Sequence, residues 1–305
     1  MSHIPATGSQ YEIRSGDHVA VLVELGGGLR TYTVGGEHVI DGYTEDEIPP
    51  GGAGEVLAPW PNRIRDGSYP WHGETRQLAL SEAPRHNAIH GLVRFLPWEA
   101  VSKTDSAVTL RCVLSPQPGY PWRLELTTTW SVGPDGLRAE HTATNLAGSA
   151  APFGLGVHPY LQLPGVRVDD LVLTLPAERV LLVDSRLLPV GARVVTGTEW
   201  DYNDGRRIGS AQLDSAFSRA DPDGGSAAVL ASPDGGRSLR MWADSVFRWW
   251  QVFTGDALAA PRTRRSVALE PMTCPPDAFH SGRDVITLEP GATWRGAWGI
   301  TPQLG

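Results

Sequence analysis

The sequence lacks features that would place it in several other classes of protein. Its formal net charge is -8 at pH 7 and its basic residues are dispersed, so it has no basic segment of the kind that binds nucleic acid. No uninterrupted apolar run reaches the length of a membrane span, and no basic stretch followed by an apolar core opens the chain. We therefore expect a cytoplasmic protein that binds neither nucleic acid nor membrane.

Cysteine is also scarce, with only Cys112 and Cys274 in 305 residues. Two widely separated cysteines in a chain long enough to bury a large core are expected to be free thiols. Cys274 lies four residues from Glu270, but a nucleophilic thiolate needs a neighbouring cation or histidine, and none is adjacent. We interpret both cysteines as structural.

Helical periodicity is rare, whereas β-branched and aromatic runs with partial alternation are frequent. The expected strands include Val19–Leu25, Ala107–Leu114, Arg123–Trp130 and Val246–Phe253. The 35 glycines and 25 prolines fall between such runs, as in Gly26–Gly28, Gly35–Gly36, Pro134–Gly136, Pro222–Gly225 and Pro233–Gly236. The pattern predicts an all-β protein, a large antiparallel β-sandwich. With no repeat or linker visible, we expect a single domain over residues 1–305.

The segment Ala268–Phe279 is the most informative part of the chain. It places Glu270 at the end of an apolar run and follows it with turn-forming prolines, so that this carboxylate is expected to be partly desolvated. Two histidines, His158 in Gly156–Tyr160 and His90 in Asn87–Gly91, stand beside rigid Pro or Gly positions. Together they suggest a Glu/His acid–base pair rather than surface charges.

Five segments in the same chain order resemble the aldose 1-epimerase (galactose mutarotase-like) family. They are Pro61–Tyr69, Ile89–Gly91, Gly156–Tyr160, Leu213–Phe217 with Gln251–Gly255, and Leu269–Phe279. Each segment alone is a weak signal, but the ordered set is specific. The resemblance implies a many-stranded antiparallel sandwich with a sugar site on one concave face, which agrees with the strands and turns expected from the sequence.

The resemblance also implies the reaction and the residues that perform it. Opening a cyclic sugar requires a base at the anomeric hydroxyl and an acid at the ring oxygen, and the family pattern gives these roles to Glu270 and His158. No cofactor and no covalent intermediate are implied. The expected sugar-binding residues are Arg63, His90 and Asp214, together with Asn62 and Tyr160. Trp60 and Phe279 are further candidates, because a sugar's C–H face packs on aromatic rings.

Other charged or ligating residues are interpreted as structural. His72, His86 and His280 lack the spacing and acidic company of a metal site, so no metal is expected. Asp277 is expected to accept hydrogen bonds from backbone amides in a turn. The run Arg262–Arg265 is expected to be a solvated loop rather than an anion site.

The substrate remains open at this stage. Leu92 follows Gly91 where the family usually has a second glycine, and Met272 stands where Gln is frequent. One alternative is a mutarotase for a sugar with an anionic C6 group, bound by Arg65 or Arg94. Others are a glycoside hydrolase or lyase, in which only Asp214 could partner the catalytic carboxylate, and a non-catalytic carbohydrate-binding protein. The expected partner is a small-molecule sugar, and the sequence does not separate a monomer from a homodimer.

Overall fold

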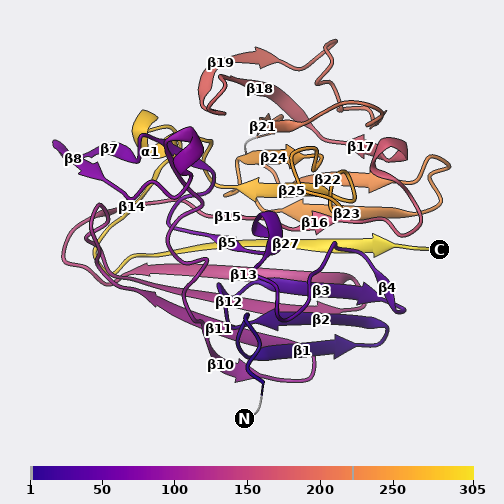
Figure 1. Cartoon of the computed structure of the whole chain (residues 1–305), viewed down its shortest axis with the longest axis horizontal. Helices are drawn as coiled ribbons and strands as arrows, with labels where there is room; N and C mark the ends of the chain where they lie inside the picture. The colour runs from indigo at the N-terminus through magenta and orange to yellow at the C-terminus, as the bar shows by residue number, and fades with distance from the viewer. Residues whose placement is uncertain (1–2, 222) are drawn as a thin grey trace.

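The computed structural model describes residues 3–221 and 223–305, and strands dominate it (Figure 1). The paired strands in its three larger sheets run antiparallel. The predicted all-β, antiparallel sandwich class is therefore confirmed. The α-helix α1 (Ala278–Ser281) has four residues, and no helix in the described ranges is long and apolar enough to cross a membrane.

The largest sheet has nine strands and gives the clearest match between sequence pattern and structure. In spatial order they are β10 (Glu99–Lys103), β11 (Ala107–Leu114), β12 (Leu124–Gly133), β13 (Gly136–Asn145), β27 (Thr293–Gln303), β23 (Ser238–Ala243), β22 (Ser226–Ala231), β17 (Val172–Thr174) and β20 (Arg206–Arg207). Alternate residues of β11 and β12 are buried, because successive side chains of a strand point to opposite faces.

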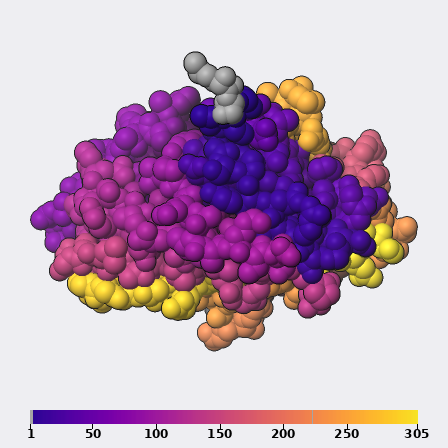
Figure 2. All heavy atoms as spheres, turned by 90° about the horizontal axis from the view of Figure 1, so that it is seen from below, coloured from indigo at the N-terminus to yellow at the C-terminus, as the bar shows by residue number. Residues whose placement is uncertain are grey.

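A four-stranded sheet near the N-terminus packs on part of the nine-stranded sheet. It is formed by β1 (Gln10–Ser15), β2 (His18–Val23), β3 (Leu29–Val34) and β4 (Glu37–His38). Strands β1 and β2 contact β11, β12 and β13. In the view from below, the N-terminal half of the chain, in indigo and magenta, forms most of the visible face, and yellow C-terminal residues appear along its edges (Figure 2).

The eight-stranded sheet positions the residues of the candidate site. Its strands are β19 (Pro189–Val194), β18 (Ala177–Val183), β21 (Asp214–Arg219), β24 (Trp249–Phe253), β25 (Val267–Met272), β15 (Gly156–Val157) and β5 (Val56–Leu57), and β16 (Tyr160–Leu161) also pairs with β25. One buried apolar cluster draws side chains from this sheet, the nine-stranded sheet and the four-stranded sheet. This shared core fixes the sheets that carry the site.

Short strand pairs and 3-10 helices connect the three larger sheets. The two-stranded pairs are β6 (Arg63–Arg65) with β9 (Asn87–Ile89), β7 (Ser68–Trp71) with β8 (Glu74–Gln77), and β14 (Ala151–Phe153) with β26 (Ile286–Leu288); the 3-10 helices are η1 (Pro50–Gly52), η2 (Ala83–Arg85) and η3 (Val168–Asp170). Glycine turns at 35–36, 134–136 and 233–236 join consecutive strands as predicted. Of the expected turn at 222–225, residue 222 lies outside the described residues. The expected strand 246–253 begins only at Trp249, because residues 244–247 form a turn.

Candidate active site

A cavity of about 340 Å³ lies against β21, β24 and β25, with the β6–β9 pair contributing to its wall. This volume lies at the low end of the roughly 300–1,000 Å³ usual for small-molecule sites. The cavity is lined by Gly51, Asn62, Arg63, Ser81, Glu82, Arg85, Ile89, His90, Arg94, His158, Tyr160, Leu187, Asp214, Gln251, Phe253, Ala257, Leu258 and Glu270. The seven residues expected from the sequence to act on a sugar are all among them.

Glu270 is held in the middle of β25, opposite Gln251 of β24. Gln251 and Phe253 both reach the cavity because they are two residues apart on one strand. Glu270 is only 2% exposed, and its Oε2 has no hydrogen-bond partner among the described residues. The carboxyl group is therefore desolvated yet faces the cavity, as expected for a group that acts on a ligand.

His158 follows β15 and meets Glu270 across the cavity wall. Its Nε2 lies 3.3 Å from Oε1 of Glu270, although the two residues are 112 positions apart in the chain. The ring is stacked on that of Tyr160, with centroids 5.0 Å apart and planes inclined by 21°. The expected Glu/His pair thus exists as a direct contact, within reach of proton transfer.

Burial controls the protonation of this pair. It raises the pKa of the Glu270 carboxyl well above its usual range, with the nearby Asp214 adding to the effect and Arg63 opposing it. Burial, together with the nearby Arg94 and Arg63, lowers the pKa of His158 to about 3. Both shifts favour the neutral forms, so a proton shared by the pair is favoured on Glu270 rather than on His158.

Asp214, at the start of β21, reaches the same cavity and is fixed by Gln251. The Nε2 of Gln251 donates to Oδ1 of Asp214 at 2.6 Å. Burial raises the pKa of Asp214, whereas Arg63 and this hydrogen bond oppose the shift. Gln251 was present in a segment that carries the family resemblance, but its own role was not predicted. It orients a carboxylate that can accept hydrogen bonds from vicinal hydroxyls.

Arg63 is clamped in a fixed orientation at the cavity edge. Its Nε and Nη2 each donate to Glu82 at 2.9 Å, a bidentate arrangement. Glu82 also accepts from Arg85 and Asn87. Although burial opposes it, these hydrogen bonds lower the pKa of Glu82. The sequence predicted neither Glu82 nor Arg85 as a site residue, because their position at the cavity depends on contacts that only the fold creates.

His90 presents a neutral ring to the cavity. Its Nδ1 accepts a hydrogen bond of 3.2 Å from the backbone N–H of Asn62, which places the ring proton on Nε2. Burial lowers the pKa of His90 well below its usual value, and His158, Arg94 and Arg63 add to this effect. The ring meets that of His158 edge-on, with centroids 5.4 Å apart. His90 is thus a neutral donor beside the Glu270–His158 contact.

Two aromatic residues expected to line the sugar site belong to the core instead. Trp60 and Phe279 are both buried and pack on each other with centroids 5.7 Å apart, and neither lines the cavity. Phe253 takes that position, together with Tyr160, whose hydroxyl donates to the carbonyl of Gly51 at 2.9 Å. The expectation for Trp60 and Phe279 was wrong because both rings are buried in the core, where they pack on each other.

The structure also separates the two arginines considered for an anionic substituent. Arg65 does not line the cavity, because its Nε pairs with Asp277 at 3.2 Å. Asp277 also accepts from the backbone N–H of Arg65 at 2.9 Å. The expectation that Asp277 would bond amides of its own turn was wrong, because its carboxylate instead joins that turn to β6 and makes no cap hydrogen bond at α1. Arg94 does line the cavity, and its Nη1 donates to Glu55 at 2.8 Å. Only Arg94 remains in a position to contact a ligand.

A second and larger cavity, of about 1160 Å³, is lined in part by the arginine-rich loop, and its wall also includes His38, Glu45, Glu47 and Asp169. The expectation of a solvated run is confirmed for Thr263 and Arg265, which are exposed, but it was wrong for Arg262 and Arg264, whose side chains are only 16% and 20% exposed. Arg262 pairs with the buried Asp41, and Arg264 pairs with Asp169 and Asp256. Because these guanidinium groups are already paired with carboxylates of the protein, this larger cavity is a weaker candidate for a ligand site than the one beside Glu270.

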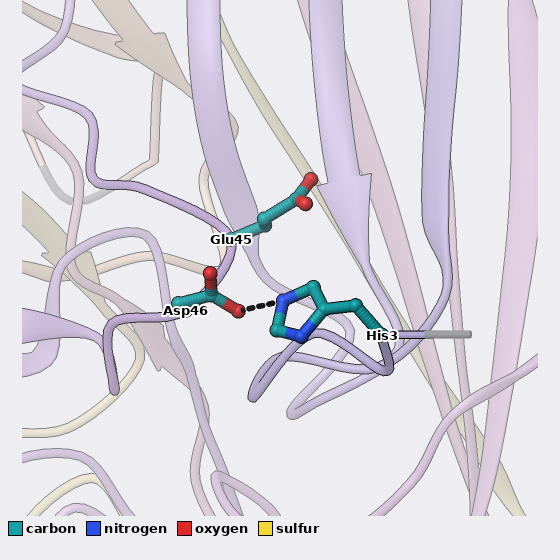
Figure 3. Close-up of side chains that lie close together, drawn as sticks. All are labelled: His3, Glu45 and Asp46. Atoms are coloured by element: carbon teal, nitrogen blue, oxygen red, sulfur yellow. Dashed lines mark hydrogen bonds and ion pairs between the residues drawn. The ribbon is translucent and has the colours of Figure 1, made fainter. Parts of the chain in front are cut away.

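The remaining ligating groups show no comparable organisation. His3, Glu45 and Asp46 bring potential ligand atoms together, with His3 Nε2 2.7 Å from Asp46 Oδ1 (Figure 3). The first and last of these are exposed, and nothing in the described residues encloses the group. Both cysteines are buried and free, and burial raises the pKa of Cys274 to about 12, which makes it a poor nucleophile.

Comparison with known proteins identifies the family and agrees with the fold. The family model for aldose 1-epimerase matches residues 9–301. The Escherichia coli K12 protein YihR is 33% identical over 296 residues, which cover 97% of this chain and 94% of YihR. The GalM/aldose epimerase homologue of C. elegans superposes with a TM-score of 0.86 at 19% identity, covering 96% of this chain and 98% of that one. Galactose 1-epimerase of Lactobacillus acidophilus gives a TM-score of 0.82 at 20% identity, covering 99% and 96%.

Fold and family model together define a carbohydrate-active protein of the galactose mutarotase-like fold. The chain belongs to the aldose 1-epimerase family.

Proposed function

We propose that this protein is a mutarotase, which interconverts the α and β anomers of an aldohexose by general acid–base catalysis. The observation that carries the proposal is the 3.3 Å contact between Glu270 and His158 in a cavity of monosaccharide size. Family membership supports the class of reaction. The buried environment of the pair supports its role, because strongly shifted pKa values in a cavity mark groups that exchange protons.

The single proton held by the pair accounts for both halves of the reaction. Because both pKa shifts favour a proton on Glu270 in the resting pair, that proton first passes to His158 across their 3.3 Å contact. In ring opening, the resulting carboxylate of Glu270 takes the proton from the anomeric hydroxyl while protonated His158 gives its proton to the ring oxygen, and the bond between C1 and the ring oxygen breaks. The C1–C2 bond of the open aldehyde then rotates. In closure, neutral His158 takes the proton back from the ring hydroxyl, which attacks C1, and the Glu270 carboxyl protonates the aldehyde oxygen. The proton on His158 then passes back to Glu270 and the pair returns to its starting state, so no cofactor enters the balance.

The surrounding residues are proposed to hold the sugar. Asp214 accepts from ring hydroxyls, while Arg63 and neutral His90 donate to ring or hydroxyl oxygens. Tyr160 completes the wall by packing against the sugar. Asn62 orients Arg63, because the Oδ1 of Asn62 accepts a hydrogen bond of 2.9 Å from the backbone N–H of Arg63. A glycoside hydrolase is less well supported, because the group in contact with Glu270 is an imidazole rather than a second carboxylate.

Arg94 supports a second substrate class, an aldohexose with an anionic C6 group. It lines the cavity with one hydrogen bond to protein, from Nη1 to Glu55, among the contacts of the described residues. Its other N–H groups are therefore available to a sulfonate or phosphate.

Polarimetry tests the proposal. Freshly dissolved single anomers of glucose, galactose and C6-phosphorylated or C6-sulfonated glucose are followed with and without protein, and the spontaneous rate is subtracted. Acceleration of at least one sugar is expected. No acceleration of any aldose by folded protein would refute the mutarotase assignment.

A further inference from the structure

Glu55 is a buried carboxylate directly behind the proposed acid, His158. It precedes β5, and its backbone carbonyl accepts from the N–H of His158 at 3.1 Å. The N–H of Gly54 in turn donates to the carbonyl of His158 at 2.9 Å. The main chain at Glu55 therefore fixes the backbone of His158.

The side chain of Glu55 has a different partner, Arg94. Its Oε2 accepts from Arg94 Nη1 at 2.8 Å, whereas Oε1 has no partner among the described residues. The two side chains are 2% and 16% exposed, so this is a nearly buried ion pair. Such a pair costs desolvation free energy and is weak evidence of a contribution to stability, so its presence beside the cavity needs another explanation.

The local backbone leaves room for this arrangement. Gly52 has a φ of +83°, and a Cβ there would lie 3.2 Å from Cδ2 of His158 and 3.3 Å from Oε2 of Glu55. A larger residue at this position would press on both side chains. Beyond the pair, the guanidinium of Arg94 lies 4.9 Å from the ring centroid of Phe95, which limits its movement away from the cavity.

We propose that Glu55 is a positioning residue that holds Arg94 against the cavity wall, so that the free N–H groups of Arg94 bind oxygen atoms of the sugar. The proposal rests on the proposed mutarotase function, because it assigns a binding role within that site. Glu55 itself does not line the cavity and exchanges no proton with the sugar. Its effect is therefore expected in KM rather than in kcat.

The protonation of Glu55 gives a further readout. Burial raises its pKa to about 7, with Arg94 opposing the shift. The other titratable groups near it are His158, Tyr43 and Tyr160, and burial favours the neutral form of all three in the protein without sugar. As the pH falls through 7, Glu55 takes up a proton and loses its charge, so its hold on Arg94 weakens. The KM of the wild type is expected to rise toward that of a variant with a neutral residue 55.

The test compares Glu55→Gln, Arg94→Met and the double variant, with Glu125→Gln as control. Glu125 pairs with Arg111 at the surface of the nine-stranded sheet, far in sequence from every cavity residue. At pH 8 we expect Glu55→Gln to raise KM about 5- to 10-fold with kcat within 2-fold, and the control to change neither. The double variant should resemble Arg94→Met, because Glu55 acts through Arg94.

Two results would overturn the proposal. One is an unchanged KM in Glu55→Gln at pH 8. The other is a double variant whose KM change equals the product of the two single changes, which would indicate a role of Glu55 independent of Arg94. In either case catalysis by the wild type would leave the mutarotase function standing. A wild type that neither accelerates mutarotation nor binds an aldose in isothermal titration calorimetry would refute both proposals.

Discussion

Gln251 stands directly opposite Glu270 in the β24–β25 pair, and its side chain donates to Asp214 on the other neighbouring strand. Gln251 thus lies on the strand between the proposed base and the proposed sugar-binding carboxylate, and its amide holds the second of these. The two carboxyl groups therefore reach one small cavity from different strands, and Asp214 still raises the pKa of Glu270.

Replacing Gln251 with Leu removes the donor to Asp214 while preserving the volume of the side chain. An unpaired buried carboxylate costs about 1–3 kcal/mol, so we expect KM to rise about 10-fold through misorientation of Asp214. The measurement is steady-state polarimetry on the best substrate. Asp214→Asn provides the comparison, because the double variant should be no worse than the more impaired single variant if Gln251 acts through Asp214.

Glu270→Gln and His158→Asn remove the two proton-exchanging groups but keep their shapes. General acid–base assistance is typically worth about 100- to 10,000-fold, so each variant should lose at least about 100-fold in kcat. Because the two groups act as one unit, the double variant should lose little more than either single variant. Near wild-type rates in Glu270→Gln, with an unchanged circular dichroism spectrum, would remove Glu270 from the base role.

Several of these features follow from the sequence alone. Alternation predicted β11 at its observed bounds, because its two faces differ in burial along the whole strand. The Glu270 and His158 motifs were visible because each combines a reactive residue with rigid Pro or Gly neighbours.

Other features depend on contacts that the local sequence does not contain. Arg65 was considered for the cavity, but its partner Asp277 is 212 residues away. Glu55 and Glu82 carry no motif, and each acquires its role only from the arginine that the fold places beside it. Trp60 shows the same limit for aromatic residues, since the sequence does not reveal which way its ring turns.

His141 provides a prediction about acid stability, away from the site. It is buried, its Nε2 accepts from the indole N–H of Trp298 at 2.8 Å, and its Nδ1 lies 2.9 Å from the hydroxyl of Thr128. Protonation of Nε2 would leave two N–H donors facing each other, that of His141 and that of the indole. Burial lowers the pKa of His141 from the usual 6.5 to about 3. Below pH 6.5 the unfolded chain therefore binds a proton that the folded state does not, and stability is lost as the pH falls toward 3.

One proton bound only by the unfolded chain lowers the free energy of unfolding by about 1.4 kcal/mol for each pH unit below about 6.5. His141 should therefore account for about 2 kcal/mol of lost stability between pH 7 and pH 5. Urea unfolding of the wild type and His141→Gln at both pH values measures it. The variant is less stable at pH 7, but the difference should shrink at pH 5. Exposed His38 serves as control, since His38→Gln should leave the pH dependence unchanged. Parallel pH dependence in wild type and His141→Gln would contradict the prediction.

Variants of Arg94 and Arg65, as test and control, distinguish a neutral from an anionic sugar substrate. Both are partly buried and both pair with a carboxylate, but only Arg94 lines the cavity. If the substrate carries a C6 phosphate or sulfonate, the wild type should prefer it to glucose by about 10-fold or more in kcat/KM, since a hydrogen-bonded pair with a charged group contributes about 1.5–3 kcal/mol.

Arg94→Ala should abolish the preference, and added salt should weaken it. Arg65→Ala should leave the ratio of the two kcat/KM values unchanged even where it lowers stability. No preference in the wild type, or a preference that survives Arg94→Ala, would leave a neutral aldohexose as the substrate.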